Sequence, residues 1–197
     1  MNKEKILLGS SNQGKITEFL FYINNFKIFK NLEIVTLDNF PNIAEPEENK
    51  LTFTSNANLK SLYFYSKSEL ASLSDDSGFI IDGSENFPGV KTARYAKDNG
   101  GIAGAIKSLF QKYNEPDTIP ITFHCSLSYK SHDREISATG SVKGHLINTS
   151  TGENGFGYDP YFVPMNNNKT FAEMEKEQKL LQSHRFYAFQ DLALKII

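Results

Sequence analysis

Short apolar runs alternate with amphipathic segments along the first 75 residues of the chain. Three apolar runs predict strands: residues 5–9, 33–37 and 70–73. After Lys15, apolar residues recur at the spacing of one helical face, and a second, less regular helix is expected from about Thr52 to Lys67. The order strand, helix, strand, helix, strand predicts an α/β core. Ligands bind to such sheets where the strand ends gather the loops, so the loops at residues 9–15 and 74–78 should meet there.

The pattern changes after these elements. A helix is expected after Gly100, and its apolar face consists of Ile102, Ile106, Leu109 and Phe110. Apolar and polar residues then alternate over residues 119–147, which predicts a long strand and a partner that returns antiparallel from about Arg134. Lys179 is expected to close one helix, and residues 183–185 to start another. With no internal repeat and no low-complexity linker, the two halves are expected to share one sheet or to pack as two lobes around a cleft.

Composition and charge narrow the classes of function. The chain has 197 residues, which suits one domain spanning residues 1–197. Its net charge of −2 and its pI of about 6.1 leave no basic footprint, so we expect no polymeric nucleic acid as a partner. No apolar run approaches the ~18 residues of a membrane span, and the early first strand leaves no room for a signal peptide. The single cysteine, Cys125, suits a reducing compartment. We therefore expect a cytoplasmic protein without a membrane partner.

The stretch Ser74–Gly78 places two adjacent carboxylates, Asp75 and Asp76, at the end of the apolar run over residues 70–73. Two such groups repel each other and are costly to bury, whereas a hard divalent ion such as Mg²⁺ takes oxygen ligands and offsets that cost. The alternative is an Asx-rich turn with the next strand starting at Phe79. The pair is therefore a candidate metal site whose support must come from the rest of the chain.

A polar, glycine-bounded loop runs from Gly9 to Lys15 before the first expected helix. Such a strand, loop and helix resembles a phosphate-binding turn, where loop N–H groups and the helix N-terminus face an anion. The loop even satisfies the Gly-x-x-x-x-Gly-Lys part of a P-loop, but Ile16 stands where Ser or Thr would hold Mg²⁺. Metal ligands would have to come from elsewhere, and Asp75 and Asp76 could supply them. The alternative for Lys15 is a solvated residue in the first helical turn.

Three glycines surround aromatic residues over residues 152–162. This composition suits a loop that approaches a flat ligand, on which an aromatic ring can stack. The alternative is a tight turn whose aromatics return to the core, and we prefer it for Tyr161 and Phe162. Further along, His184 and Arg185 offer hydrogen-bond donors for the carbonyl groups of a base and cations for phosphates.

Taken together, these motifs resemble, in order and over nearly the whole chain, those of the inosine triphosphate pyrophosphatase (Ham1/RdgB) family. The motifs are residues 10–15, Leu51-Thr52-Phe53, Asn56-Ala57, Asp75-Asp76-Ser77-Gly78, Pro88-Gly89-Val90, Ala93-Arg94-Tyr95-Ala96, Gly155-Phe156-Gly157-Tyr158-Asp159-Pro160, residues 170–174 and Ser183-His184-Arg185. The resemblance implies Mg²⁺-dependent hydrolysis of ITP, dITP and XTP to the monophosphate and pyrophosphate, which cleanses the nucleotide pool. It also implies an α/β fold with an elongated central mixed sheet, flanking helices and two lobes around a nucleotide-binding cleft, usually as a homodimer.

The resemblance also implies roles for individual residues. The triphosphate is held by Ser10, Ser11, Asn12, Gln13, Gly14 and Lys15, with Lys60 as a second cation. Asp76 is the metal-binding carboxylate and general base, and Glu48, by its distance ahead of Lys60, is the second metal ligand. The base pocket and its surroundings comprise Ser77, Phe156, Gly157, Tyr158, Asp159, Lys179, His184 and Arg185.

These residue types suit the chemistry. Water that attacks the α-phosphorus needs a base, here Asp76, and cations such as Lys15 and Lys60 to offset charge on the phosphate oxygens. Donors from His184 or Arg185 would pair with the 6-keto oxygen of a purine. The amino group of adenine at the same position would instead face another donor. Such a mismatch can reject an analogue by about 10⁴-fold.

Three positions depart from the family pattern: Lys50, Ser55 and Gln182. The first two flank the expected metal region around Glu48. Two other classes of function remain open. A P-loop ATPase or kinase would transfer the terminal phosphate, although Ile16 argues against it, and a non-catalytic nucleotide sensor would bind without turnover.

Overall fold

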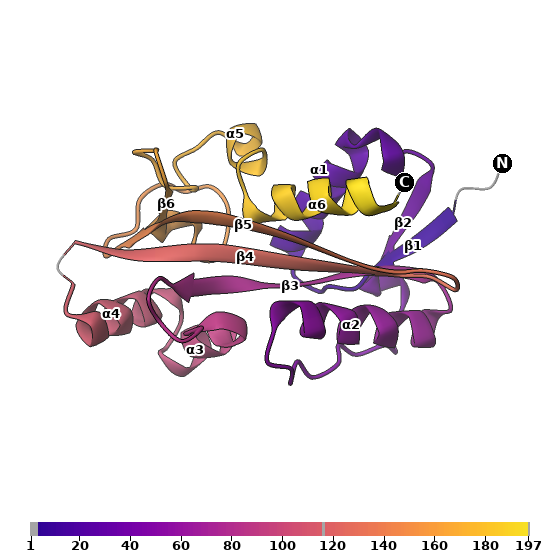
Figure 1. The fold of residues 1–197 in the computed structure, drawn as a ribbon, viewed down its shortest axis with the longest axis horizontal. Helices are drawn as coiled ribbons and strands as arrows, with labels where there is room; N and C mark the ends of the chain where they lie inside the picture. Colours follow the sequence, from indigo (N-terminus) through magenta and orange to yellow (C-terminus); the bar gives the residue numbers. More distant parts are fainter. Residues whose placement is uncertain (1–3, 116, 197) are drawn as a thin grey trace. The chain divides into compact units, whose positions relative to one another are not determined.

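The computed structural model describes residues 4–115 and 117–196 (Figure 1). The helices are α1 (Gln13–Asn25), α2 (Phe53–Ser68), α3 (Thr92–Asp98), α4 (Ile102–Tyr113), α5 (Lys176–Leu180) and α6 (His184–Ile196). The strands are β1 (Glu4–Leu8), β2 (Leu32–Thr36), β3 (Ala71–Ile81), β4 (Thr118–Lys130), β5 (Glu135–Ile147) and β6 (Phe162–Pro164). Short 3-10 helices are η1 (Lys27–Phe29), η2 (Leu37–Asn39), η3 (Gly89–Lys91) and η4 (Asp159–Tyr161). None of the helices within the described ranges carries an apolar stretch long enough to span a bilayer.

The strands form a six-stranded sheet in the order β2-β1-β3-β4-β5-β6. β1 pairs in parallel with both β2 and β3, whereas β5 and β6 are antiparallel. β4 and β5 are joined by a tight turn in which the Ser131 N–H donates to the Arg134 carbonyl. The prediction of an α/β fold with a mixed sheet and flanking helices is therefore confirmed.

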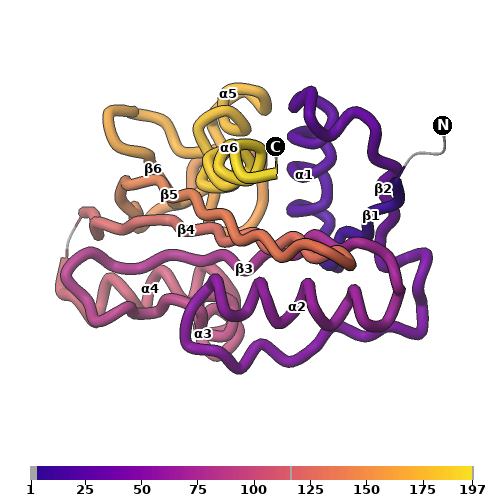
Figure 2. The backbone as a smooth tube through the Cα atoms, turned by 45° about the vertical axis from the view of Figure 1, so that its right-hand side comes forward, coloured from indigo at the N-terminus to yellow at the C-terminus, as the bar shows by residue number. Residues whose placement is uncertain are grey.

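The described residues divide into two compact units. The first unit comprises residues 4–77, 125–140 and 185–196. Within it, α2 covers one face of the strands, and α1 and α6 cover the other (Figures 1 and 2). α1 and α6 pack through aromatic rings, with the Phe189 ring 5.3 Å from Phe19 and 5.0 Å from Tyr22. This apolar packing fixes the first turn of α1, which carries several of the residues expected to bind phosphate.

The second unit comprises residues 78–115, 117–124 and 141–184. Its core is aromatic at the centre, where the rings of Phe123 and Phe162 lie 4.6 Å apart and Phe162 also contacts Phe171. The expected apolar face of α4 is buried on this core at Ile106 and Leu109. Phe162 is fully buried, so the prediction that it returns to the core is confirmed.

One expectation about β3 was wrong. The sequence predicted a strand over residues 70–73, and its alternative was a turn followed by a new strand from Phe79, but β3 is one strand over Ala71–Ile81. The apolar run ends where β1 ends, because β1 pairs with β3 only up to Leu8 opposite Leu73. Beyond that point β3 stays extended, and the side chains of Asp75, Asp76 and Ser77 have partners on the helices. The carboxylates therefore follow the end of β1, not the end of their own strand.

Candidate active site

The adjacent carboxylates of β3 are held by helices on opposite faces of the sheet. Successive side chains of a strand point to opposite faces. Asp75 lies 2.9 Å from Lys15 of α1, measured from Oδ2 to Nζ. Asp76 Oδ2 accepts a 2.8 Å hydrogen bond from Asn56 Nδ2 of α2. The two carboxylates, adjacent in sequence, thus have different partners and different chemistry.

Asp75 is fully buried and ionised. Burial alone would raise its pKa, but the charges of Lys15, Lys60 and Arg185 lower the pKa below its usual value. Lys15 is correspondingly not the solvated residue considered as an alternative, because its side chain is 16% exposed and paired with Asp75. Asp75 therefore serves as an internal anion that gathers cations in the first unit.

Asp76 has the opposite character. Its pKa is raised to about 6, mainly by burial and also by the charge of Glu48, while a hydrogen bond from Asn56 acts in the opposite direction. A carboxylate with a pKa near neutrality accepts protons well at physiological pH. Asp76 is thus suited to act as a general base.

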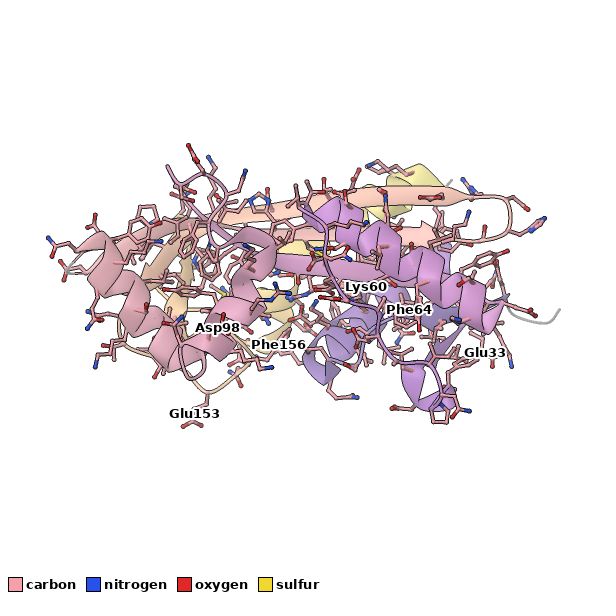
Figure 3. All side chains as sticks on the ribbon, turned by 90° about the horizontal axis from the view of Figure 1, so that it is seen from below. Glu33, Lys60, Phe64, Asp98, Glu153 and Phe156 are labelled. Carbon is pink, nitrogen blue, oxygen red and sulfur yellow. The ribbon has the colours of Figure 1, made fainter. Side chains whose placement is uncertain are left out.

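Lys60 lies on α2 and is almost completely buried (Figure 3). Its Nζ is 2.9 Å from Glu48 Oε1 and 3.7 Å from Glu45 Oε2. Burial alone would lower the pKa of Lys60, but the charges of Asp75, Glu48 and Glu45 raise it well above its usual value. The structure therefore brings a permanent cation beside Glu48, one of the two expected metal ligands.

The loop after β1 meets β3, as the sequence predicted. The Gly9 N–H donates to the Leu73 carbonyl at 2.9 Å. A Cβ at Gly9 would lie 2.3 Å from both Ser74 Oγ and the Phe64 ring, so only glycine allows this approach. Ser10 is buried directly after it, and its Oγ accepts a hydrogen bond from the Asn12 N–H.

α1 starts earlier than expected. Asn12 is the N-cap, and its side chain accepts a 3.1 Å hydrogen bond from the Lys15 N–H. Gln13, Gly14 and Lys15, expected in the loop, therefore form the first helical turn. The Ser11 N–H, just before the cap, donates to Glu45 Oε1 at 2.7 Å.

Arg185, at the start of α6, joins the site through two residues of the first unit. Its Nη1 lies 3.2 Å from Glu18 Oε2, and its Nη2 donates to Ser77 Oγ at 3.3 Å. Glu18 is a buried acidic residue that the sequence motifs did not single out. Its spacing of three residues from Lys15 puts both on one side of α1, and that spacing was the available signal.

The second unit holds the glycine-rich loop in place through Asp159. Its Oδ2 accepts hydrogen bonds from the Phe156 N–H at 2.7 Å and from Lys179 Nζ at 2.6 Å. Lys179 also lies 4.8 Å from the centroid of the Phe156 ring. Gly157 follows at a positive φ of 65°, which favours glycine. Asp159 and Lys179 thus shape the loop that carries Phe156.

Two further rings of the second unit pack against phenylalanines. The His184 ring is stacked on Phe123 at 4.9 Å with an interplanar angle of 11°. Tyr158 is buried with its ring 5.0 Å from Phe79, in an edge-on contact. Phe156 is the half-buried ring of the glycine-rich loop, so it is better placed than Tyr158 to stack on a flat ligand.

The carboxylates of the first unit fit a divalent cation that is shared with a ligand. Within the described ranges, no group of three or more His, Cys, Asp or Glu side chains is arranged to hold an ion by itself. Asp76 and Glu48 supply hard oxygen donors, and a cation would offset the burial and the repulsion from Glu48 that together raise the pKa of Asp76. Magnesium commonly takes one or two carboxylates and completes its shell with water and substrate phosphates.

The departures from the family pattern have structural explanations near the metal region. Lys50 is exposed, and its backbone N–H donates to Asn56 Oδ1 at 2.9 Å. Ser55 lies in the first turn of α2, where its N–H and its Oγ both bond to Thr52 Oγ1. Within residues 4–115 and 117–196, no hydrogen bond or ion pair joins either side chain to Asp76 or Glu48.

Comparison with known proteins places these features in context. Residues 6–195 match the model of the Ham1 family. A dITP/XTP pyrophosphatase of Listeria monocytogenes is 36% identical, covering 98% of this chain and 95% of that protein, and one of Bacillus cereus is 32% identical, covering 99% and 96%. The structure of the Staphylococcus aureus Ham1 protein has a TM-score of 0.82 at 31% identity, and that of a HAM1 protein from Coxiella burnetii 0.84 at 27%. Both comparisons cover 98% of each chain.

Proposed function

Because the chain belongs to the Ham1 family, as its motifs predicted, we propose that it hydrolyses non-canonical purine nucleoside triphosphates. The substrates are ITP, dITP and XTP, and the products are the nucleoside monophosphate and pyrophosphate. The relatives named dITP/XTP pyrophosphatase support this substrate class. The observation that carries the proposal is Asp76, a buried carboxylate with a pKa of about 6 that feels the charges of Lys15 and Glu48.

The residues of the first unit would bind the triphosphate. Backbone and side-chain donors of residues 10–15 lie at the N-terminus of α1, where an anion is favoured. Lys15 and Lys60 add positive charge next to these donors. The strong ionisation of Lys60 supports this role, because a permanently charged lysine offsets phosphate charge at any physiological pH.

The reaction is a displacement at the α-phosphorus. Asp76 accepts a proton from the attacking water, the new P–O bond forms, and the bond to the β-phosphate oxygen breaks to release pyrophosphate. Asn56 holds the Asp76 carboxylate in place for this transfer. We propose Mg²⁺ as the divalent cation, held by Asp76 and Glu48. When bound, it would neutralise charge on the phosphate oxygens.

Residues of the second unit would select the base. Phe156 offers a ring for stacking, and Asp159 and Lys179 hold its loop. Donors from His184 or Arg185 would meet the 6-keto oxygen, so adenine nucleotides should be rejected by about 10⁴-fold or more. Near-equal hydrolysis of ATP and ITP would contradict this assignment.

The remaining expectations stay predictions. These are a single domain over residues 1–197, a homodimer, a cytoplasmic location, and no membrane or polymeric nucleic acid partner. Of the two alternative classes, a P-loop ATPase would release inorganic phosphate and a sensor would show no turnover. Neither alternative would release pyrophosphate, which distinguishes both from the proposed function.

Product analysis tests the proposal. The full chain is incubated with ITP, XTP, dATP or GTP and Mg²⁺, and pyrophosphate is separated from phosphate. Asp76→Asn removes the base, and Asp98→Asn, at an exposed carboxylate ending α3, is the matched control (Figure 3). We expect pyrophosphate from ITP and XTP with the wild type and the control, and none with Asp76→Asn. Release of phosphate, or no turnover by the wild type, would overturn the proposed function.

A further inference from the structure

Glu45 contacts two separate groups of the phosphate-binding region. It lies in the polar segment between η2 and α2, far from residues 10–15 in sequence. Its Oε1 accepts a 2.7 Å hydrogen bond from the backbone N–H of Ser11, and its Oε2 lies 3.7 Å from Lys60 Nζ. One carboxylate thereby joins a loop donor to a buried cation.

The Ser11 N–H and the Lys60 ammonium are also the kinds of group that bind a phosphate. A backbone N–H has one hydrogen to donate, and a carboxylate and a phosphate oxygen are both anionic acceptors that compete for it. The proposed function assigns the Ser11 loop and Lys60 to the triphosphate. Glu45 and the substrate therefore use overlapping donors.

The way Glu45 is held makes displacement feasible. Its side chain is 33% exposed, so moving it into solvent does not leave a charge buried. Its contact with Lys60 is longer than that of Glu48, which lies 2.9 Å from the same nitrogen. Lys60 would therefore keep a carboxylate partner when Glu45 moves away.

We propose that Glu45 is an internal competitor of phosphate. Its carboxylate accepts from the Ser11 N–H and interacts with the charge of Lys60 until a triphosphate or pyrophosphate displaces it. The inference rests on the proposed function of residues 10–15 and Lys60. Its consequence is twofold: the loop keeps its conformation through Glu45, and polyphosphate binding is weaker than the bare donors would allow. Weaker binding of the pyrophosphate product favours its release.

A direct role in binding predicts the opposite sign. If Glu45 were a ligand of the cation that accompanies the phosphates, its removal would weaken pyrophosphate binding. If Glu45 competes with phosphate, its removal strengthens that binding. The sign of the change in affinity therefore decides between the two.

The experiment measures magnesium pyrophosphate binding by calorimetry at fixed pH and ionic strength, with the wild type, Glu45→Gln and Glu47→Gln. Glu47 is an exposed carboxylate of the same segment, so its variant removes the same charge without touching Ser11. We expect Glu45→Gln to bind about 3- to 10-fold more tightly, as for the loss of one competing hydrogen bond. The Glu47 variant should stay within about twofold, because exposed charges are largely screened. Glu45→Ala also removes the carbonyl acceptor that a Gln side chain keeps, so it should tighten pyrophosphate binding at least as much.

A second measurement follows the Ser11 amide itself by NMR of the ¹⁵N-labelled chain. The Ser11 resonance should move on Glu45→Gln and on addition of pyrophosphate to the wild type. The substitution Glu47→Gln should leave it in place. Unchanged or weaker binding in both Glu45 variants, or a Ser11 resonance insensitive to Glu45, would overturn the inference. Failure of the proposed function is separately visible, because the wild type would then release no pyrophosphate from ITP.

Discussion

Replacing Asn56 by Ala should shift the pH dependence of catalysis. Asn56 is almost fully buried, its Nδ2 donates to Asp76 Oδ2, and its Oδ1 accepts from the Lys50 N–H. The bond to Asp76 favours the ionised carboxylate and lowers its pKa, so its loss raises the pKa above about 6. A base must be ionised to act. The acid limb of the rate profile should therefore move to higher pH.

The magnitude follows from the kind of bond that is lost. A hydrogen bond to a charged group contributes about 1.5 kcal/mol or more, which is roughly tenfold in the ionisation equilibrium of Asp76. At pH 6 the ionised fraction of Asp76 then falls from about one half to about one eleventh, so we expect kcat/KM for ITP to fall by about fivefold. Above pH 8, where the carboxylate ionises in both proteins, most of the loss should be recovered.

The assay is the pH profile of kcat/KM for the wild type, Asn56→Ala and Asn58→Ala. Asn58 is the matched control, because it also lies on α2 and accepts a 2.8 Å hydrogen bond from Ser137 Oγ, away from Asp76. Carboxyl ¹³C NMR on the metal-free chain would report the titration of Asp76 directly. An Asn56→Ala profile that falls equally at all pH values would refute the electrostatic reasoning and indicate a purely structural role.

Three further predictions concern stability and packing. Asp76→Asn should stabilise the fold at pH 8 by up to about 3 kcal/mol and have little effect near pH 4, because the raised folded-state pKa destabilises the fold increasingly as the pH rises from the ordinary value of 3.8 to about 6; urea unfolding that shows equal effects at both pH values would contradict this. Glu18→Gln breaks the buried pair with Arg185 and should cost about 3 kcal/mol in the same assay, whereas a loss below about 1 kcal/mol would show that the pair contributes little. Gly9→Ala places a Cβ against Ser74 and should lower the free energy of unfolding by about 1–3 kcal/mol and also reduce turnover of ITP; an unchanged melting temperature would argue against the tight contact.

Much of the architecture could be predicted from the sequence because its signals are local. The apolar spacing over α1 and α4 and the alternation over β4 and β5 each depend on a few neighbouring residues. The order of the motifs identified the family, which the comparisons confirmed. The meeting of the Gly9 loop with β3 followed from the general placement of loops at strand ends.

The roles of Asp75 and Asp76 were only half predictable. Their sequence marked a polar site after a buried strand, but it suggested that the strand ended at Leu73 and that the carboxylates acted together. In the structure β3 continues, so the alternation of a strand directs Asp75 to Lys15 and Asp76 to Asn56. A local pattern could not show this, because β3 continues past its last pair with β1 as the neighbour of β4, a strand from residues 118–130 that is distant in the sequence.

The sequence by itself determined the order of elements, the family and the residue types available for phosphate, metal and base. Only the tertiary structure decided which of these residues act on one another. Glu45 meets Ser11 across 34 residues, Asn56 meets Asp76 across 20, and Glu18 meets Arg185 across 167. Each pair involves polar side chains whose local surroundings would suit solvent equally well. Their partners are set by the packing of α1, α2 and α6 around the strands, and this packing depends on contacts that no short stretch of sequence contains.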